Sequence, residues 1–157
     1  MTGDTDPADA VALQQALRER PELLGEAYEA VGRAGYRELP LHAGVEYTRD
    51  EWLREEATRP EGSLVALAQG IVVGYAGMLV HANGPAAAEH GLLVVRPDRR
   101  RRGLGTALRR AQLAWASANG VHELVDWTQG DNTVVRRFNE RLGYRHGAVN
   151  LRVEGPR

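Results

Sequence analysis

The chain has 157 residues, the length of one ordinary domain, and folding could bury about two thirds of its extended surface. With 43% apolar and 26% charged residues, its composition is that of a globular protein, neither disordered nor membranous. The absence of cysteine excludes disulfides, thiolate zinc sites and a cysteine nucleophile. No apolar run approaches the roughly 20 residues that span a bilayer, and the acidic N-terminus does not resemble a signal peptide, so we expect a cytoplasmic protein without a membrane partner.

The net charge of −1 hides an uneven distribution of charge along the chain. Residues 1–95 contain seven Arg against 15 Asp and Glu, a net charge of −8. Residues 96–157 contain 13 Arg against six Asp and Glu, a net charge of +7, and the chain has no lysine. This polarity predicts that the C-terminal part binds something anionic.

The N-terminal part of the chain predicts helices. Its apolar residues recur at helical spacing, and the segments begin at capping residues and end at Gly or Pro. In chain order we expect residues 1–7 to be disordered, a helix from Asp6-Pro7 through Leu17, a helix over 21–34 stopped by Gly35, irregular structure over 36–47, and a short helix capped by Thr48 or Asp50 and ended by Pro60.

From residue 63 onward the pattern changes to short β-type runs, later alternating with helices. We expect strands over 63–68, 71–80 and 86–95, a helix over 104–119, a strand over 123–128, a helix from Asp131/Asn132 to Leu142, and a strand over 144–153. Gln69-Gly70 reads as a hairpin turn between the first two strands. The order of elements predicts one α/β (α+β) domain over residues 1–157 with a mixed sheet.

The most informative stretch joins the strand expected over 86–95 to the helix expected over 104–119. Four consecutive arginines, Arg99 to Arg102, precede Gly103-Leu104-Gly105. The first turn of a helix presents unpaired N–H groups and a positive dipole end, glycines let an anion approach, and arginines neutralise its charge. The stretch lacks the residues of a Walker A loop or a dinucleotide fingerprint. It therefore predicts a phosphate-type anion site.

A solvated turn or a nucleic-acid patch is the alternative interpretation of four consecutive arginines. Nucleic-acid binders seldom confine their charge to one strand–helix junction, so we expect no nucleic-acid partner. Binding to DNA or RNA with a steep salt dependence would support the alternative.

Two segments resemble motifs of the GNAT superfamily of acyl-CoA-dependent N-acyltransferases. Val95-x-Pro97-x-x-Arg100-x-x-Gly103-x-Gly105 looks like the acetyl-CoA signature of that family. About 30 residues later, the segment that runs from Trp127-Thr128 through Asn132 and Phe138-Asn139 to Leu142-Gly143-Tyr144 resembles the second family element. The similarity covers about residues 48–153, and the two motifs at this separation are specific together.

The resemblance implies a fold and a ligand. The fold is a mixed, mostly antiparallel central sheet flanked by helices and splayed at the acyl-CoA site, and the cosubstrate is acetyl-CoA without a metal. The backbone of Leu93 to Val95 would pair with pantetheine and the acyl carbonyl, and the N–H groups of Arg100 to Thr106 would hold the pyrophosphate. The implied CoA-binding residues are Leu93, Val94, Val95, Arg100, Arg101, Arg102, Gly103, Leu104, Gly105, Thr106, Asn132 and Asn139.

The chain departs from the family pattern in two places. Many members carry Phe-Tyr where this chain has Phe138-Asn139, and that tyrosine often protonates the leaving thiolate, so the general acid is left open. Members also usually open with a strand, and residues 1–7 are too short and too polar to form one. A trimmed N-terminal half, or a likeness to the second half of a tandem member, would leave a sheet edge free to pair in a homodimer.

Glu89 is the expected general base. It lies six residues before Val95, so a period of two places Glu89, Gly91, Leu93 and Val95 on one face of the strand. Histone-type members of the superfamily carry a catalytic glutamate at the corresponding place, and partial burial raises the pKa of such a carboxyl group. The alternative is a surface glutamate at a strand start. His90 is expected on the opposite face as a packed or capping histidine.

Two aromatic residues complete the candidate site. Tyr144 is the candidate for the general acid, with an apolar plug as the competing role. Trp127, near a strand end, is the candidate for lining the acceptor pocket, with a core position as the alternative. The remaining histidines are scattered without ligand spacing, so we expect no metal, and no serine lies in a hydrolase motif.

These features predict an N-acetyltransferase that moves an acetyl group from acetyl-CoA to a primary amine of a small molecule or peptide by direct attack in a ternary complex. The acidic N-terminal half is compatible with a cationic amine, and a solvated acidic surface explains it equally well. The alternative function is a non-catalytic CoA-binding sensor or interaction domain of the same fold.

Overall fold

The structure, a computed structural model, describes residues 13–38, 46–127 and 133–145. The chain divides into two compact units, residues 1–126 and residues 127–157. The first unit contains every described strand and the helices that cover the sheet. The second contains helix α6 (Thr133–Arg141).

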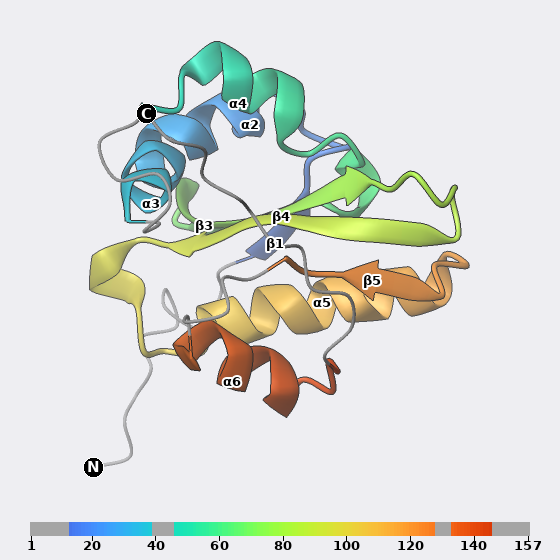
Figure 1. The fold of residues 1–157 in the computed structure, drawn as a ribbon. Coiled ribbons are helices and arrows are strands. Elements are labelled where there is room, and N and C mark those ends of the chain that lie inside the picture. The colour runs from blue at the N-terminus through green and yellow to red at the C-terminus, as the bar shows by residue number, and fades with distance from the viewer. Residues whose placement is uncertain (1–12, 39–45, 128–132, 146–157) are drawn as a thin grey trace, which may run out of the picture. The chain divides into compact units, whose positions relative to one another are not determined.

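A five-stranded sheet with the order β1-β2-β3-β4-β5 forms the centre of the first unit (Figure 1). Its strands are β1 (Leu13–Ala16), β2 (Leu64–Ala68), β3 (Ile71–Val80), β4 (Ala87–Val95) and β5 (Glu123–Val125). The pairs from β1 to β4 are antiparallel, and β5 runs parallel to β4. The expected fold class, an α/β (α+β) arrangement around a mixed and mostly antiparallel sheet, is confirmed.

Helices cover both faces of this sheet (Figure 1). On one face lie α2 (Leu23–Ala27), a π-helical turn (Tyr28–Gly32), α3 (Arg33–Arg37) and α4 (Arg49–Glu55); on the other lies α5 (Leu104–Ala118). All five residues of β2 are therefore buried, as expected for a strand covered on both sides. We refer below to the α2–α4 face and the α5 face.

The core of the α2–α4 face is built around Trp52 and Tyr75. Trp52 is fully buried, its ring lies 4.6 Å from that of Tyr75, and its Nε1–H donates to the Leu24 carbonyl over 2.9 Å. Thr48, one of the two expected caps, begins α4 with a capping box, in which Thr48 and Glu51 each accept the backbone N–H of the other with a side-chain oxygen. Packing and capping together fix the helix that ends beside β3 and β4.

The N-terminus differs from the sequence expectation. Leu13–Ala16, expected inside a helix that runs through Leu17, forms strand β1 and pairs antiparallel with β2. The opening strand that seemed to be lacking is therefore present, and it fills the β2 edge on which the homodimer expectation rested. Helical spacing of Leu13 and Leu17 misled the prediction because a vacant sheet edge outweighs local propensity. Residues 1–7 lie outside the described residues.

The next helical segment runs past its expected end. Gly35 was expected to stop it, yet the helix continues to Arg37. A Cβ atom on Gly35 would lie 2.5 Å from Cγ2 of Val94, so glycine is needed here for the close approach of α3 to β4. β5 ends at Val125, three residues before its expected end. Tyr144 and Arg145 are not in a strand, and the rest of the strand expected over 144–153 lies outside the described residues.

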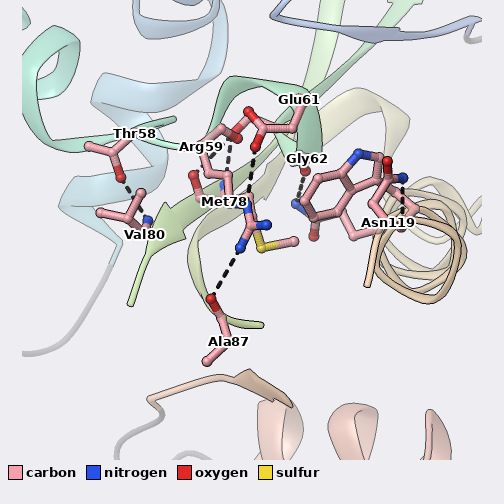
Figure 2. Close-up of polar contacts among 11 residues, drawn as sticks. Thr58, Arg59, Glu61, Gly62, Met78, Val80, Ala87 and Asn119 are labelled. Atoms are coloured by element: carbon pink, nitrogen blue, oxygen red, sulfur yellow. Dashed lines mark hydrogen bonds and ion pairs between the residues drawn. The ribbon is translucent and has the colours of Figure 1, made fainter. Parts of the chain in front are cut away.

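The side chain of Arg59 ties β4 to the segment before β2 (Figure 2). Its Nη1–H donates to the carbonyl of Ala87 over 3.1 Å, and its Nε pairs with Glu61 over 3.1 Å. The guanidinium lies 5.0 Å from the ring of Trp115 on α5, a cation–π contact. These contacts anchor the start of β4 just before Glu89.

Candidate functional site

A β-bulge interrupts β4 at Gly91-Leu92. Met78 faces His90 and Ala76 faces Leu93, so three steps along β4 match two steps along β3. An extra residue in one strand reverses the side-chain alternation beyond it. Odd-numbered residues of β4 therefore face one side of the sheet before the bulge and the opposite side after it.

The bulge corrects the expected orientation of Glu89. Leu93 packs in the cluster that contains Leu108 of α5, whereas Leu92 and Val94 pack on the α2–α4 face. Before the bulge, His90 contacts α5 through Arg109, so alternation turns Glu89 and Gly91 toward the α2–α4 face. The expectation that Glu89 and Gly91 share a face with Leu93 and Val95 is wrong, because it assumed a regular strand. His90 lies opposite Glu89, as expected.

The sheet opens immediately after Glu89. The parallel pairing of β4 with β5 ends at Glu89 and Val125, and no described strand pairs with that edge of β4 farther on. The carbonyl of Val95 points to this open edge and accepts from Nε of Arg100 over 2.8 Å. Because strand backbone groups alternate between edges, the N–H and C=O of Leu93 point the same way. Among the described residues, this edge of β4 therefore has no partner strand beyond Glu89, at the position expected for the acyl-CoA site.

The start of α5 lies at the end of this open strand and has the geometry of an anion site. Gly103, the N-cap residue, has a φ of 84° and supplies no capping side chain. The first helical hydrogen bond of α5 runs from the N–H of Ala107 to the carbonyl of Gly103, which leaves the preceding amides of the helix outside its ladder. Gly105 needs neither a positive φ nor close packing, since its nearest neighbours would be 3.9 Å from a Cβ atom. A bare backbone here suits the approach of a ligand.

Some arginines at the loop between β4 and α5 already form ion pairs within the protein. Arg96 pairs with Asp98, and Arg100 pairs with Glu38 over 3.0 Å while it donates to Val95. Arg101, the third of the four consecutive arginines, has a φ of 64°, a left-handed conformation that is uncommon outside glycine. The loop is thus folded onto β4 and α3, with its turn leading directly into the start of α5.

The other described candidate residues belong to the second unit. They are Trp127, Asn139 and Tyr144, and the N–H of Tyr144 donates to the carbonyl of Asn139 after α6. Asn132 lies outside the described residues. The roles expected for these four residues remain predictions, as do those of Glu89 and of the CoA-binding residues on β4 and α5.

Glu56, which sequence reasoning did not select, lies at the bulge. It follows the last residue of α4, is 9% exposed, and uses Oε2 to accept from the Tyr75 hydroxyl over 2.8 Å and from the Leu92 N–H over 3.3 Å. Burial raises the pKa of the Glu56 carboxyl group. Its sequence neighbourhood is that of an exposed helix end, so the sequence offered a signal only in Gly77 and Gly91.

A second buried polar cluster lies on the α5 face. Arg109 contacts Nδ1 of His90, donates to Gln112 over 3.0 Å and pairs with Asp126 over 3.5 Å. Burial, and then the charge of Arg109, lower the pKa of His90 to about 2. His90 is therefore a neutral packed histidine, as expected, rather than an acid or base for catalysis near neutral pH.

The part of the chain that the structure describes contains no group of three acidic or histidine side chains arranged to hold a metal ion. None of its helices combines the length and the apolarity needed to cross a bilayer.

A mixed sheet whose pairing ends beside a glycine-lined helix start is the arrangement that the resemblance to acyl-CoA-dependent acyltransferases implied. A family described as "Acetyltransferase (GNAT) family" matches residues 21–144, and the chain belongs to this family. It is 33% identical to a mycothiol acetyltransferase of Parafrankia sp. (strain EAN1pec) over 153 residues, which is 96% of this chain and 40% of the relative. The chain thus spans less than half of the length of that relative.

Solved structures show the same fold. An N-acetyltransferase from Staphylococcus aureus Mu50 aligns with a TM-score of 0.69 at 17% identity, covering 87% of this chain and 84% of the other. The PaiA N-acetyltransferase of Thermoplasma acidophilum in complex with coenzyme A aligns with a TM-score of 0.66 at 16% identity, covering 87% and 91%.

Proposed function

We propose that this chain transfers an acetyl group from acetyl-CoA to a primary amine of a small molecule, by direct attack in a ternary complex. The single observation that carries the proposal is the opening of the sheet after Glu89 and Val125, beside a helix start lined by Gly103 and Gly105. Membership of the GNAT family supports the same conclusion.

The donor binds along the open edge of β4. Backbone groups of Leu93 and Val95 pair with the pantetheine arm, and the amides of the loop and first turn, residues 100–106, hold the pyrophosphate. Arg101 and Arg102 contribute positive charge at that turn. Asn132 and Asn139 contact the CoA arm, following the family motif that they match.

The transfer requires one base, one acid and a polarised carbonyl. Glu89 takes a proton from the amine, directly or through a water, as the nitrogen attacks the thioester carbon. Backbone N–H groups at the open edge polarise the carbonyl oxygen. The C–N bond forms, the C–S bond breaks, and the thiolate leaves with a proton from a general acid, for which Tyr144 is the candidate.

The acceptor is a small-molecule amine in this proposal. The relatives are named mycothiol acetyltransferases, which favours a small acceptor over a peptide. Glu89 points to the α2–α4 face, so the amine approaches from that face. Residues 1–95 carry a net charge of −8, which suits a cationic amine.

Calorimetry and a thiol-release assay test the proposal. We expect acetyl-CoA to bind with a dissociation constant below about 1 mM, and an amine panel that includes the non-acetylated form of mycothiol to give turnover. Glu89→Gln should lower kcat by about 10²-fold or more and leave CoA binding unchanged. Absence of CoA binding would contradict the proposal, and Glu29→Gln, at an exposed helical position, is the matched control.

The second candidate function, a CoA-binding domain without turnover, is favoured by one observation, the asparagine at position 139 in place of a tyrosine. It predicts CoA binding, no thiol release with any amine, and no effect of Glu89→Gln.

A further inference from the structure

Side chains from opposite faces of the sheet hold the bulge of β4. From the α2–α4 face, Glu56 accepts the N–H of Leu92 over 3.3 Å. From the α5 face, Nε2 of Gln112 donates to the carbonyls of Ala76 over 3.1 Å and Gly77 over 3.2 Å, on β3 opposite the bulge. A bulge disrupts the ladder between strands, and here buried side chains take up the backbone groups beside it.

Two glycines leave the space that the Glu56 carboxyl group occupies. A Cβ atom on Gly77 would lie 2.6 Å from Oε2 of Glu56, and one on Gly91 would lie 2.4 Å from the same atom. Any other residue at either position would displace the carboxyl group. The Tyr75 hydroxyl fixes its orientation over 2.8 Å. This is a fitted site for one carboxylate oxygen, on two adjacent strands.

Burying a carboxyl group is unfavourable, and here burial raises its pKa. An apolar residue would fill the same space without that penalty, but it could not accept the N–H of Leu92. Both hydrogen bonds that Glu56 makes fall on Oε2, which leaves Oε1 without a partner among the described residues. Its contacts therefore point to a role that depends on the backbone at the bulge.

The bulge has two consequences for the proposed reaction. It turns Glu89 to the α2–α4 face while Leu93 and Val95 keep their side chains on the α5 face. It also lies next to the point where the pairing of β4 with β5 ends among the described residues. A regular β4 in the same register beyond Leu93 would turn Glu89 toward α5, where His90 now contacts Arg109.

We propose that Glu56 is a positioning residue for acyl transfer, which holds the Leu92 amide and thereby keeps both Glu89 and the open edge of β4 in their working geometry. The assignment rests on the proposed function and deepens it, because Glu56 acts through the backbone on the base and on the donor site. It makes Glu56 a geometric requirement rather than a second base.

A pair of conservative variants tests this role. Glu56→Gln keeps an oxygen at the same reach and can still accept the Leu92 N–H. Glu56→Asp keeps a carboxyl group but is one methylene shorter and withdraws from that N–H. We expect Glu56→Asp to lower kcat by about tenfold or more with a smaller change in the KM for acetyl-CoA, and Glu56→Gln to stay within about threefold of the wild type.

Two controls separate positioning from stability. Glu29→Gln changes an exposed carboxylate elsewhere in the same helical layer and should leave kcat unchanged. Tyr28→Phe removes a hydrogen bond of 2.6 Å to the Tyr47 carbonyl, and so lowers stability away from the bulge; it should also leave kcat unchanged. Wild-type kcat in Glu56→Asp, or a loss in Glu56→Gln as large as in Glu56→Asp, would overturn the assignment.

Hydrogen exchange of the backbone amides tests the same inference without turnover. In the free protein, Glu56→Asp should speed exchange at Leu92 by about tenfold, and Glu56→Gln should not. Equal exchange in both variants would overturn the positioning role even if the wild type proved active. A wild type that binds no acetyl-CoA would instead overturn the proposed function, and the exchange result would still stand.

Discussion

The two faces of the sheet hold buried polar groups of different chemistry at the same bulge. On the α2–α4 face, Glu56 is a single acid that accepts from Tyr75 and Leu92, and burial raises its pKa. On the α5 face, Arg109 is a buried cation balanced by Asp126, next to His90, whose pKa is lowered. Burial favours the uncharged form of both titratable groups, Glu56 and His90.

The two faces make different contributions to the protein. The α5 face contains a closed network in which each charge has a protein partner, which is typical of a structural role. The α2–α4 face holds a carboxyl group with one oxygen engaged by the backbone of β4, next to the strand position from which Glu89 projects. We therefore assign stability mainly to the first cluster and the geometry of the site mainly to the second.

Breaking the α5 cluster should have the largest effect on stability. The Arg109 side chain is 4% exposed and that of Asp126 is 10% exposed, so Arg109→Leu leaves a buried carboxylate without its cation. We expect a loss of about 3–5 kcal/mol in the free energy of unfolding, measured by urea denaturation. Arg54→Ala breaks the exposed pair with Glu55 and should cost no more than about 0.5 kcal/mol; equal losses would contradict the comparison.

A methyl group at the bulge should disturb the other face. Gly91→Ala places a Cβ atom 2.4 Å from the Glu56 carboxylate, and we expect a loss of about 1–3 kcal/mol together with a fall in kcat. The double variant Gly91→Ala/Glu56→Ala should lose less stability than the sum of the two single variants, because the shorter side chain relieves the clash. Strict additivity would show that the clash is not the cause.

The local parts of the site could be predicted from the sequence, and the bulge could not. The strand, the arginine loop and Gly103-Leu104-Gly105 are contiguous, so their order alone indicated a strand, a turn and a helix, while anion binding at the turn stays a prediction. The face of Glu89 depends on counting residues along β4, and one extra residue reversed it. Gly91 was the available signal, since a lone glycine inside a strand often marks a bulge.

Glu56 and β1 were missed for a different reason. Glu56 looks like one of several acidic residues at a helix end, and only the fold brings it 36 residues along the chain to Leu92. β1 has the spacing of a helix, and its pairing with β2 depends on residues about 50 positions away. Local propensity carries no information about such partners.

A change of pH should change the stability contributed by the two clusters in opposite directions. The pKa of Glu56 is raised above its ordinary 4.5, so its contribution to stability is complete below pH 4.5 and is lost as the pH rises through the folded-state pKa. The pKa of His90 is lowered from 6.5 to about 2, so its contribution is complete above pH 6.5 and is lost as the pH falls toward 2. Each group contributes a slope of up to about 1.4 kcal/mol per pH unit.

Single variants separate these two slopes. Relative to the wild type, Glu56→Gln should gain stability as the pH rises above 4.5, and His90→Gln should gain stability as the pH falls below 6.5. Tyr75 and Glu55 face the first group, and Arg109 and Gln112 face the second, so each variant is compared at constant ionic strength. Urea denaturation at intervals between pH 4 and 8 measures both. Parallel curves for wild type and variant would contradict the assignment of that group.

The smallest effect on stability is expected at the start of α5, where a substitution should weaken CoA binding instead. Gly105→Ala adds a methyl group with no neighbour closer than 3.9 Å, in a helical position where alanine is favoured, so stability should stay level or rise by up to about 1 kcal/mol. The same methyl group obstructs the approach of a phosphate to the helix amides, and the dissociation constant for CoA should rise by about tenfold or more. Calorimetry measures the binding and thermal denaturation the stability. Gly91→Ala differs in that it should also lower stability, since Gly91 makes room for the protein's own carboxyl group, whereas Gly105 leaves room for a ligand. Unchanged CoA binding in Gly105→Ala would contradict the placement of the pyrophosphate at this turn.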